Sequence, residues 1–291
     1  MTLLGLMMEI FHYWGLRENP FTNTFSLRFF YNSLQHREAL ERMSLVATNP
    51  DLYLGLLTGE VGTGKTLISR VLQVKLKNKS LVLYFPNAFS DIFQIVNSVS
   101  ALMLKTLLKD KMNLAKIEKM LRDVKSKKKL FYIFQECLKK YVKYYKKNIT
   151  IIIDECQKID KNNLLELKGI TNYLVEFKPV ISIILIGQKE ISSVFKTTEE
   201  LKSRLSIVYS LKGLNLNETN KYILHRLQVV GGKKSPFSND AIVAIHEYTK
   251  GKPREINKVC MLALQCGALN KLKYITGDTI FRIFADQYGM L

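Results

Sequence analysis

Cysteine, glycine and proline are scarce in this sequence. Its 291 residues include four cysteines, 15 glycines and six prolines. The cysteines are not spaced as zinc-binding pairs, so neither a zinc site nor a disulfide framework is supported, and a reducing cytosol fits. So little Gly and Pro excludes a collagen-like or low-complexity chain. No apolar stretch reaches the roughly 18 uncharged residues that a spanning helix needs, so we expect a globular protein that is not an integral membrane protein.

Acidic residues are also few. The 25 Asp and Glu face 44 Lys and Arg, which gives a formal net charge of +19. Fifteen of the basic residues, but only four of the acidic ones, lie in the segment 105–147. This basic segment is either a solvated, Lys-rich helical insertion or a surface for nucleic acid or anionic lipid. Because Arg122 is its only arginine, a contact with DNA would be to phosphates and not to sequence.

Short apolar segments alternate with helical patterns in the first two thirds of the chain. Strands are expected at 53–57, 81–85, 149–153, 180–186 and 207–211, with helices between them that include 91–108, 114–124, 130–145, 164–174 and 191–201. This alternation predicts an α/β fold with a parallel sheet covered on both faces. After Gly213 the pattern becomes helical, at 218–230, 238–250, 255–269 and 279–288, so we place a boundary near Leu214.

A glycine-rich loop joins the first expected strand to a helix. Its sequence is Gly59, Glu60, Val61, Gly62, Thr63, Gly64, Lys65, Thr66. This is the P-loop pattern, in which backbone N–H groups and a helix N-terminus hold phosphates. Glycine is needed because a Cβ would block the approach of the anion. Lys65 would bind the β and γ phosphates of a nucleotide, and Thr66 would bind Mg²⁺.

Two carboxylates follow the third expected strand. Asp154 and Glu155 end the apolar run 149–153, which places them at the carboxyl edge of a parallel sheet, where the P-loop also opens. Asp154 would hold Mg²⁺, directly or through water. Glu155 would orient and polarise the water that attacks the γ-phosphate. The sequence therefore predicts an ATPase with ATP and Mg²⁺ as its ligands.

Together, the two motifs resemble those of AAA+ ATPases. Several further segments are similar to the ATPase module of the general secretion pathway protein A type: 13–21, 30–31, 36–40, 59–66, 154–157, 186–190 and 251–257. The resemblance runs from about residue 13 to 285. It implies a P-loop NTPase with a five-stranded parallel sheet and a small all-helical lid. Residues 1–50 would pack on the nucleotide site, 51–213 would form the ATPase core with the basic insertion, and 214–291 the lid.

The resemblance also assigns roles to single residues. Gln188 takes the position of the sensor that bonds the attacking water or the γ-phosphate. Arg204 takes that of an arginine finger, which acts on the nucleotide of a neighbouring subunit. Arg254 takes that of a second sensor in the lid. Three residues of the opening segment are either adenine contacts or ordinary core aromatics: Phe21, Tyr31 and His36.

An arginine finger implies a homo-oligomer, either a ring or a filament. The family suggests a cytoplasmic switch or motor, or one peripheral at the inner membrane, that acts on a protein client in secretion or envelope assembly. The basic segment favours the alternative of a TniB/MuB-like regulator of transposition, bound to DNA under the control of ATP. A P-loop kinase is disfavoured, because such kinases need no helical lid.

Overall fold

The computed structural model describes residues 3–24, 26–87, 91–109 and 111–288. The chain divides into two compact units. The helical unit comprises residues 1–37, 60–67 and 211–291, and the sheet unit comprises residues 38–59 and 68–210. Residues 1, 2 and 289–291, which belong to the predicted segments 1–50 and 214–291, lie outside the described residues.

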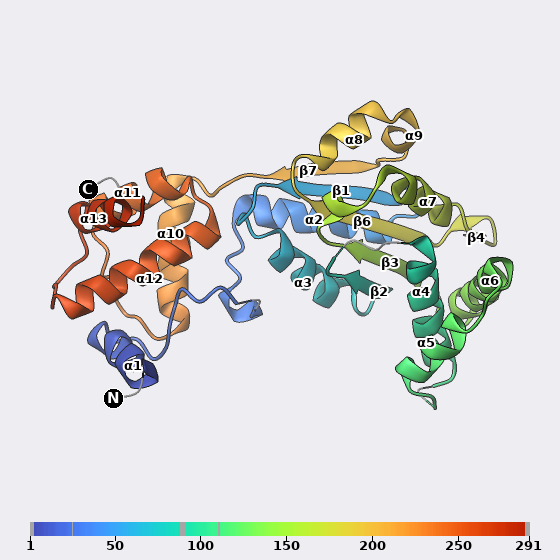
Figure 1. The fold of residues 1–291 in the computed structure, drawn as a ribbon, viewed down its shortest axis with the longest axis horizontal. Helices are drawn as coiled ribbons and strands as arrows, with labels where there is room; N and C mark the ends of the chain where they lie inside the picture. Colours follow the sequence, from blue (N-terminus) through green and yellow to red (C-terminus); the bar gives the residue numbers. More distant parts are fainter. Residues whose placement is uncertain (1–2, 25, 88–90, 110, 289–291) are drawn as a thin grey trace. The chain divides into compact units, whose positions relative to one another are not determined.

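A five-stranded sheet forms the centre of the sheet unit (Figure 1). Its strand order is β2-β3-β6-β1-β7, and β6 pairs in parallel with β3 on one side and β1 on the other. Strands β3 and β6 consist largely of buried isoleucine, as expected of strands with both faces covered. The predicted parallel sheet is confirmed. The strands are β1 (Leu54–Gly59), β2 (Ser80–Phe85), β3 (Asn148–Ile153), β6 (Ile181–Gly187) and β7 (Ile207–Leu211).

Helices connect these strands. The first two, α2 (Leu34–Thr48) and α3 (Lys65–Leu76), begin within residues of the helical unit and end in the sheet unit. The others are α4 (Ile92–Leu107), α5 (Leu114–Arg122), α6 (Lys127–Tyr145), η2 (Cys156–Lys158), α7 (Lys161–Thr171), α8 (Ile191–Thr197) and α9 (Glu199–Lys202). Asp91 caps α4 by accepting a hydrogen bond from the Phe93 N–H.

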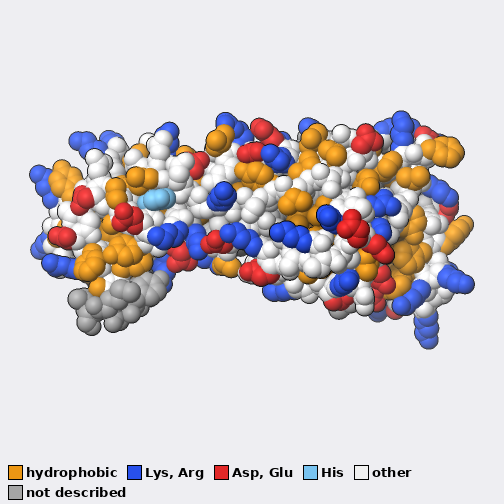
Figure 2. Space-filling model, turned by 90° about the horizontal axis from the view of Figure 1, so that it is seen from above, with side chains coloured by type: hydrophobic (Ala, Val, Ile, Leu, Met, Phe, Trp, Pro, Cys, Tyr) orange, Lys and Arg blue, Asp and Glu red, His pale blue; other side chains and the backbone are white. Residues whose placement is uncertain are grey.

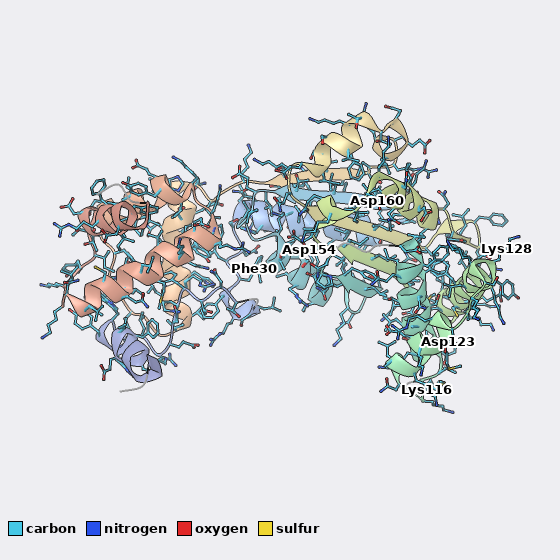
Figure 3. The ribbon with its side chains drawn as sticks, viewed as in Figure 1. Phe30, Lys116, Asp123, Lys128, Asp154 and Asp160 are labelled. Atoms are coloured by element: carbon cyan, nitrogen blue, oxygen red, sulfur yellow. The ribbon has the colours of Figure 1, made fainter. Side chains whose placement is uncertain are left out.

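The basic segment forms α5 and α6, which pack against α4 (Figure 1). One stripe of α6 is buried, with Leu130, Phe134, Leu138 and Tyr141 at helical spacing, while lysines cover its remaining surface. The labelled Lys116 and Lys128 point away from the sheet (Figure 3). Over the face shown in Figure 2, Lys and Arg side chains are widespread and acidic ones fewer.

Two expected helices differ in the structure. Helix 164–174 ends earlier, at Thr171, and Leu174 and Val175 form β4 (Leu174–Val175), which pairs antiparallel with β5 (Lys178–Pro179). Helix 191–201 is two helices, because Thr198 adopts extended backbone angles between α8 and α9. Both differences arise where short backbone irregularities leave little trace in an apolar pattern.

The helical unit combines the N-terminal segment with the C-terminal helices. Its elements are α1 (Leu3–Tyr13), η1 (Leu27–Phe29), α10 (Leu216–Val229), α11 (Asn239–Thr249), α12 (Pro253–Leu269) and α13 (Gly277–Tyr288). The Trp14 indole N–H donates to the Leu264 carbonyl oxygen over 2.9 Å. Buried Arg226 donates from Nη2 to the Thr22 carbonyl oxygen over 2.6 Å. These bonds attach the opening segment to the C-terminal helices. Among the described residues, no helix combines the length and apolarity needed to cross a bilayer.

Candidate functional site

The glycine loop lies between β1 and α3, as its motif predicts. Gly59 is the last residue of β1, and Lys65 and Thr66 are the first two of α3. Gly62 and Gly64 have φ of +85° and +99°, a region that residues with a Cβ rarely adopt. The loop therefore has the backbone that a phosphate cradle requires, at the N-terminus of a 12-residue helix.

Bonds to the Glu60 carbonyl oxygen hold the loop together. Lys65 Nζ donates to this oxygen over 2.8 Å, and Thr63 Oγ1 donates to it over 2.9 Å. Lys65 is only 7% exposed, so its ammonium group is held inside the curve of the loop. Val61, by contrast, is about half exposed at the outside of the loop.

His36 supports the loop from the opening segment. One of its ring nitrogens, Nε2, lies 3.1 Å from the Thr63 carbonyl oxygen and the other, Nδ1, lies 2.6 Å from Ser33 Oγ. Because a carbonyl can only accept, Nε2 carries the proton, and neutral Nδ1 accepts from the serine hydroxyl. Burial lowers the pKa of His36, which favours this neutral form, although the bond to Thr63 and the charge of Glu218 oppose the shift.

The start of α12 also contacts the glycine loop. The Arg254 N–H donates to the Gly62 carbonyl oxygen over 3.2 Å, and Lys252 Nζ forms an ion pair with Glu60 at 2.6 Å. A Cβ on Gly62 would approach the Arg254 Cβ to 3.0 Å. The predicted second sensor is thus attached to the loop by its backbone, while its guanidinium group is exposed.

The other adenine candidates lie in different surroundings. Phe21 is 3% exposed and packs edge-on against Phe237 in the core of the helical unit, so a nucleotide contact for it stays a prediction. Tyr31 is partly buried and its ring lies 5.8 Å from that of His225. His225 Nε2 is buried and has no hydrogen-bond partner among the described residues. His225 was not among the residues predicted from the sequence.

Asp154 lies directly beyond β3, at the carboxyl edge of the sheet (Figure 3). Its N–H donates to the Phe85 carbonyl oxygen over 2.8 Å. Its carboxylate is 2% exposed, accepts from the Tyr84 hydroxyl over 3.2 Å and accepts from the Glu155 N–H over 2.9 Å. Two donors therefore fix a buried carboxylate in place, as an Mg²⁺ ligand requires.

Gln157 connects Glu155 to the end of β6. Its Nε2 donates to Glu155 Oε2 over 2.8 Å, and its Oε1 accepts from the Gln188 N–H over 3.0 Å. The backbone N–H of Gln188 can only donate, which fixes the orientation of the Gln157 amide. Glu155 has φ of +55° and lies 3.8 Å from the exposed Lys158. Gln157 was identified from the sequence only within the segment 154–157, and it was not predicted to connect Glu155 to β6.

Arg204 lies at the opposite edge of the same sheet. It precedes β7, and its Nη1 donates to the Tyr53 hydroxyl over 3.2 Å. Tyr53 precedes β1, and the Ser206 N–H bonds the Leu54 carbonyl oxygen, so this is the edge where β1 and β7 begin. Asp154 and Gln188 lie where β3 and β6 end. Within the sheet unit, Arg204 is therefore separated from the carboxylates by the length of the strands.

The predicted residues thus form three groups. In the helical unit, the loop residues 60–66 lie with His36 and Arg254. In the sheet unit, Gln157 joins Glu155 to the backbone of Gln188, next to Asp154. Arg204 stands apart at the amino edge. Among the described residues, no group of three or more His, Cys, Asp or Glu is placed to hold a metal ion.

Comparison with known proteins agrees with this architecture. Residues 51–195 match the family model described as an AAA domain. This matched stretch, just under half of the chain, includes the glycine loop, Asp154 and Glu155, and the fold of the chain is that of the P-loop NTPase class. Within that class, its sequence is similar to general secretion pathway protein A of Aeromonas hydrophila, with 28% identity over 279 residues. This confirms the predicted resemblance. The match covers 91% of this chain but 46% of the relative, so the chain spans less than half of that protein.

Solved structures share the fold at low sequence identity. The ORC2 protein of Aeropyrum pernix is 12% identical and has a TM-score of 0.60, covering 93% of this chain and 71% of that chain. The Cdc6p protein of Pyrobaculum aerophilum is 14% identical with a TM-score of 0.58, covering 88% and 67%. The RuvB branch migration motor of Thermotoga maritima is 16% identical with a TM-score of 0.51, covering 90% and 72%. The predicted fold, a P-loop NTPase with a helical C-terminal region, is confirmed.

Proposed function

We propose that the protein binds ATP with Mg²⁺ and hydrolyses it. The observation that carries this proposal is the glycine loop, whose positive φ angles and buried Lys65 form a phosphate cradle at the start of α3. The loop leaves the sheet at Gly59, at the same edge where Asp154 follows β3. The family and fold support nucleotide hydrolysis in general.

The residues suit an in-line attack of water on the γ-phosphate. Lys65 and the loop N–H groups would bind the phosphates, and Arg254 would approach them from the start of α12. Mg²⁺ prefers oxygen ligands, and the buried Asp154 carboxylate, which accepts two hydrogen bonds, and the Thr66 hydroxyl both supply them. The ion would neutralise phosphate charge. Glu155 would accept the proton of the attacking water, held in position by Gln157 and assisted by Gln188.

The base of the nucleotide would lie near the opening segment. His36 already contacts the loop at Thr63, and Tyr31 and His225 lie together in the helical unit. We add His225 to the predicted adenine contacts Tyr31 and His36. Its buried Nε2 has no hydrogen-bond partner among the described residues, and a nucleotide base could supply one.

We further propose that hydrolysis requires a homo-oligomer. Arg204 lies at the amino edge of the sheet, away from the carboxylates of its own chain. This position supports a role for Arg204 on the nucleotide of a neighbouring copy. In the single chain, the Arg204 guanidinium group donates a hydrogen bond to the Tyr53 hydroxyl.

The name of the relative supports a role in secretion or envelope assembly, with a protein client. The comparisons do not favour the transposition regulator. Binding of DNA to the basic segment can be tested through the ATPase rate. If double-stranded DNA raises this rate, and the stimulation falls steeply as salt is added, the transposition regulator would again be favoured.

Two substitutions test the ATPase proposal. Lys65→Ala should abolish nucleotide binding, because it removes the buried cation of the cradle. Glu155→Gln should bind ATP, trap the oligomer and lose turnover. Binding of a fluorescent nucleotide and release of phosphate measure the two effects separately. Robust hydrolysis by the Glu155→Gln protein would show that another group activates the water.

A further inference from the structure

The β4–β5 hairpin carries an aromatic ring fully into solvent. Phe177 is 96% exposed and is the second residue of the two-residue turn between the strands. Both turn residues have positive φ, 51° for Glu176 and 63° for Phe177. Turns of this kind usually contain Asn or Gly, since other residues are strained there. Phe177 adds almost nothing to the core and strains the backbone, so folding does not account for it.

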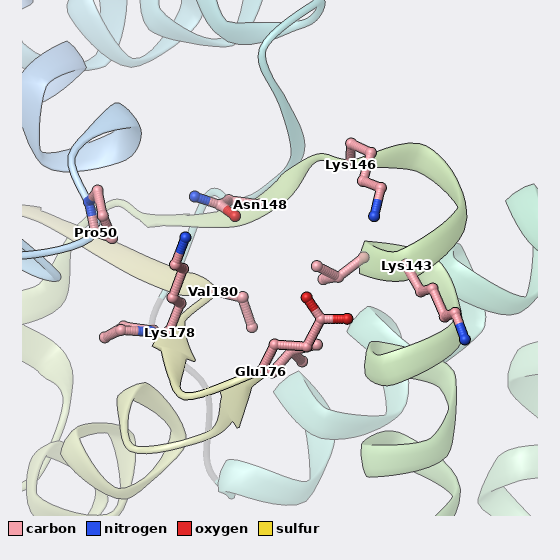
Figure 4. Close-up of a pocket in the computed structure, with 10 residues that line it drawn as sticks. Pro50, Lys143, Lys146, Asn148, Glu176, Lys178 and Val180 are labelled. Atoms are coloured by element: carbon pink, nitrogen blue, oxygen red, sulfur yellow. The ribbon is translucent and has the colours of Figure 1, made fainter.

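A basic pocket of about 290 Å³ lies beside the hairpin. Figure 4 shows the amines of Lys146 and Lys178 and the carboxylate of Glu176 around its opening, while Lys143 points away. Its walls include apolar residues such as Val142 and Val180. The amines of Lys146 and Lys178 against the single carboxylate of Glu176 leave an excess of positive charge, which favours an anionic group at the mouth of the pocket.

Other apolar side chains near these lysines are exposed. Leu174, on the same hairpin, is 51% exposed, and Tyr144, near the end of α6, is 65% exposed. We name Phe177, Lys178 and Lys146 the hairpin surface. It lies at the amino edge of the sheet, because three further residues of the pocket lie where strands begin: Pro50 and Val180 precede β1 and β6, and Asn148 is the first residue of β3.

We propose that the hairpin surface docks on a bilayer that contains anionic phospholipid. Phe177, at the tip of the hairpin, enters the boundary between headgroups and acyl chains, and Lys146 and Lys178 bind lipid phosphates at the mouth of the pocket. Lysine suits this role because its apolar stem lies along hydrocarbon while the ammonium group reaches the headgroups. Single-stranded nucleic acid fits less well, since it stacks on successive rings, whereas Phe177 is the one aromatic residue of the hairpin 174–179.

Co-sedimentation of the full chain with vesicles tests the proposal. Wild-type protein should bind vesicles with about 30% phosphatidylglycerol, and high salt should abolish this binding. It should not bind vesicles of pure phosphatidylcholine. Phe177→Asn should weaken binding about tenfold, and Phe177→Trp should retain it. The double substitution Lys146→Gln with Lys178→Gln should weaken it about twentyfold. Matched controls on the helical unit should stay within about twofold of wild type, because they leave the hairpin surface intact: Phe281→Asn, and Lys233→Gln with Lys234→Gln.

Phe177→Asn keeps the test independent of folding. Asparagine tolerates positive φ better than phenylalanine, so the melting temperature should stay the same or rise. Three results would overturn the proposal. One is failure of the wild-type protein to bind anionic vesicles. Another is a loss of oligonucleotide binding in Phe177→Asn while vesicle binding is unchanged, which would assign nucleic acid. The third is an altered concentration dependence of ATPase activity in that variant without vesicles, which would assign a contact between copies.

Discussion

Replacing Gln157 with leucine removes the connection between Glu155 and the end of β6 while keeping a side chain of similar size. In the structure one amide makes both bonds: Nε2 to Glu155 Oε2 at 2.8 Å and Oε1 to the Gln188 N–H at 3.0 Å. Without it, the Glu155 carboxylate keeps one ion-pair partner among the described residues, the exposed Lys158 at 3.8 Å. Gln157 does not contact the attacking water in this scheme and acts as a positioning residue.

The size of the effect follows from the bond that is lost. A hydrogen bond to a charged group contributes about 1.5 to 3 kcal/mol, and each 1.36 kcal/mol is a factor of about ten in rate. If this energy holds Glu155 in its reactive orientation, kcat should fall about 10- to 150-fold. Nucleotide affinity should change less than about threefold, because the phosphate cradle belongs to the glycine loop. A loss of about 1.5 to 3 kcal/mol should lower the melting temperature by about 3 to 12 °C.

The assay is steady-state phosphate release, combined with equilibrium binding of a fluorescent ATP analogue. Lys158→Ala is the matched control, because it removes the other partner of Glu155 at a 59% exposed side chain, where an ion pair contributes little. We expect it to keep kcat within about threefold of wild type. A loss of kcat with unchanged binding separates positioning from a general disturbance of the fold.

Gly187→Ala tests the same path from the opposite side. A Cβ on Gly187 would approach Gln157 Oε1 to 2.8 Å and Cys156 Sγ to 2.6 Å, so the amide must move. The Gly187→Ala and Gln157→Leu effects on kcat should therefore be less than additive in the double variant. Wild-type kcat in Gln157→Leu, or full additivity of the two effects, would refute the positioning role of Gln157.

Two further predictions concern the oligomer and pH. Arg204→Ala should bind ATP, but its specific ATPase activity should no longer rise with protein concentration. Mixing it with Lys65→Ala should restore activity, because one variant supplies the intact glycine loop and the other supplies the arginine. No recovery would show that Arg204 does not act between subunits. Burial lowers the pKa of His36, so the unfolded state takes up the proton first, and stability should fall as the pH drops below about 6.5. In urea unfolding at two pH values, His36→Gln should lose less stability on acidification than wild type, and an equal loss would contradict the assignment.

The sequence predicted features whose signals are local. Strands buried on both faces need apolar β-branched side chains along their whole length, so a run such as 149–153 can be recognised as a strand from its own residues. The glycine loop is also local, since its neighbours on the chain supply both the strand and the helix. Asp154 and Glu155 followed from the end of a recognised strand. For these elements, neighbouring residues contain all the information that the prediction needs.

Features that depend on distant contacts were missed. Nothing near Trp14 indicates that its indole bonds Leu264, so the packing of residues 1–37 on the C-terminal helices could not be read from the pattern. The β4–β5 hairpin was not predicted, and its first residue, Leu174, was predicted to end helix 164–174, because the turn residues Glu176 and Phe177 lack the usual Asn or Gly signal. Gln157 acquires its role only when the end of β6 lies beside it.

The sheet also separates two kinds of function by its edges. Asp154 and Gln188 follow the carboxyl ends of β3 and β6, whereas Arg204 and the hairpin with Phe177 lie where the strands begin. Strands of six or seven residues span roughly 20 Å, at about 3.3 Å per residue. A substitution at the amino edge therefore has no short path to the carboxylates. Arg204→Ala and Phe177→Asn should both leave nucleotide affinity unchanged, and a loss of affinity in either would show that the two edges are coupled through the strands.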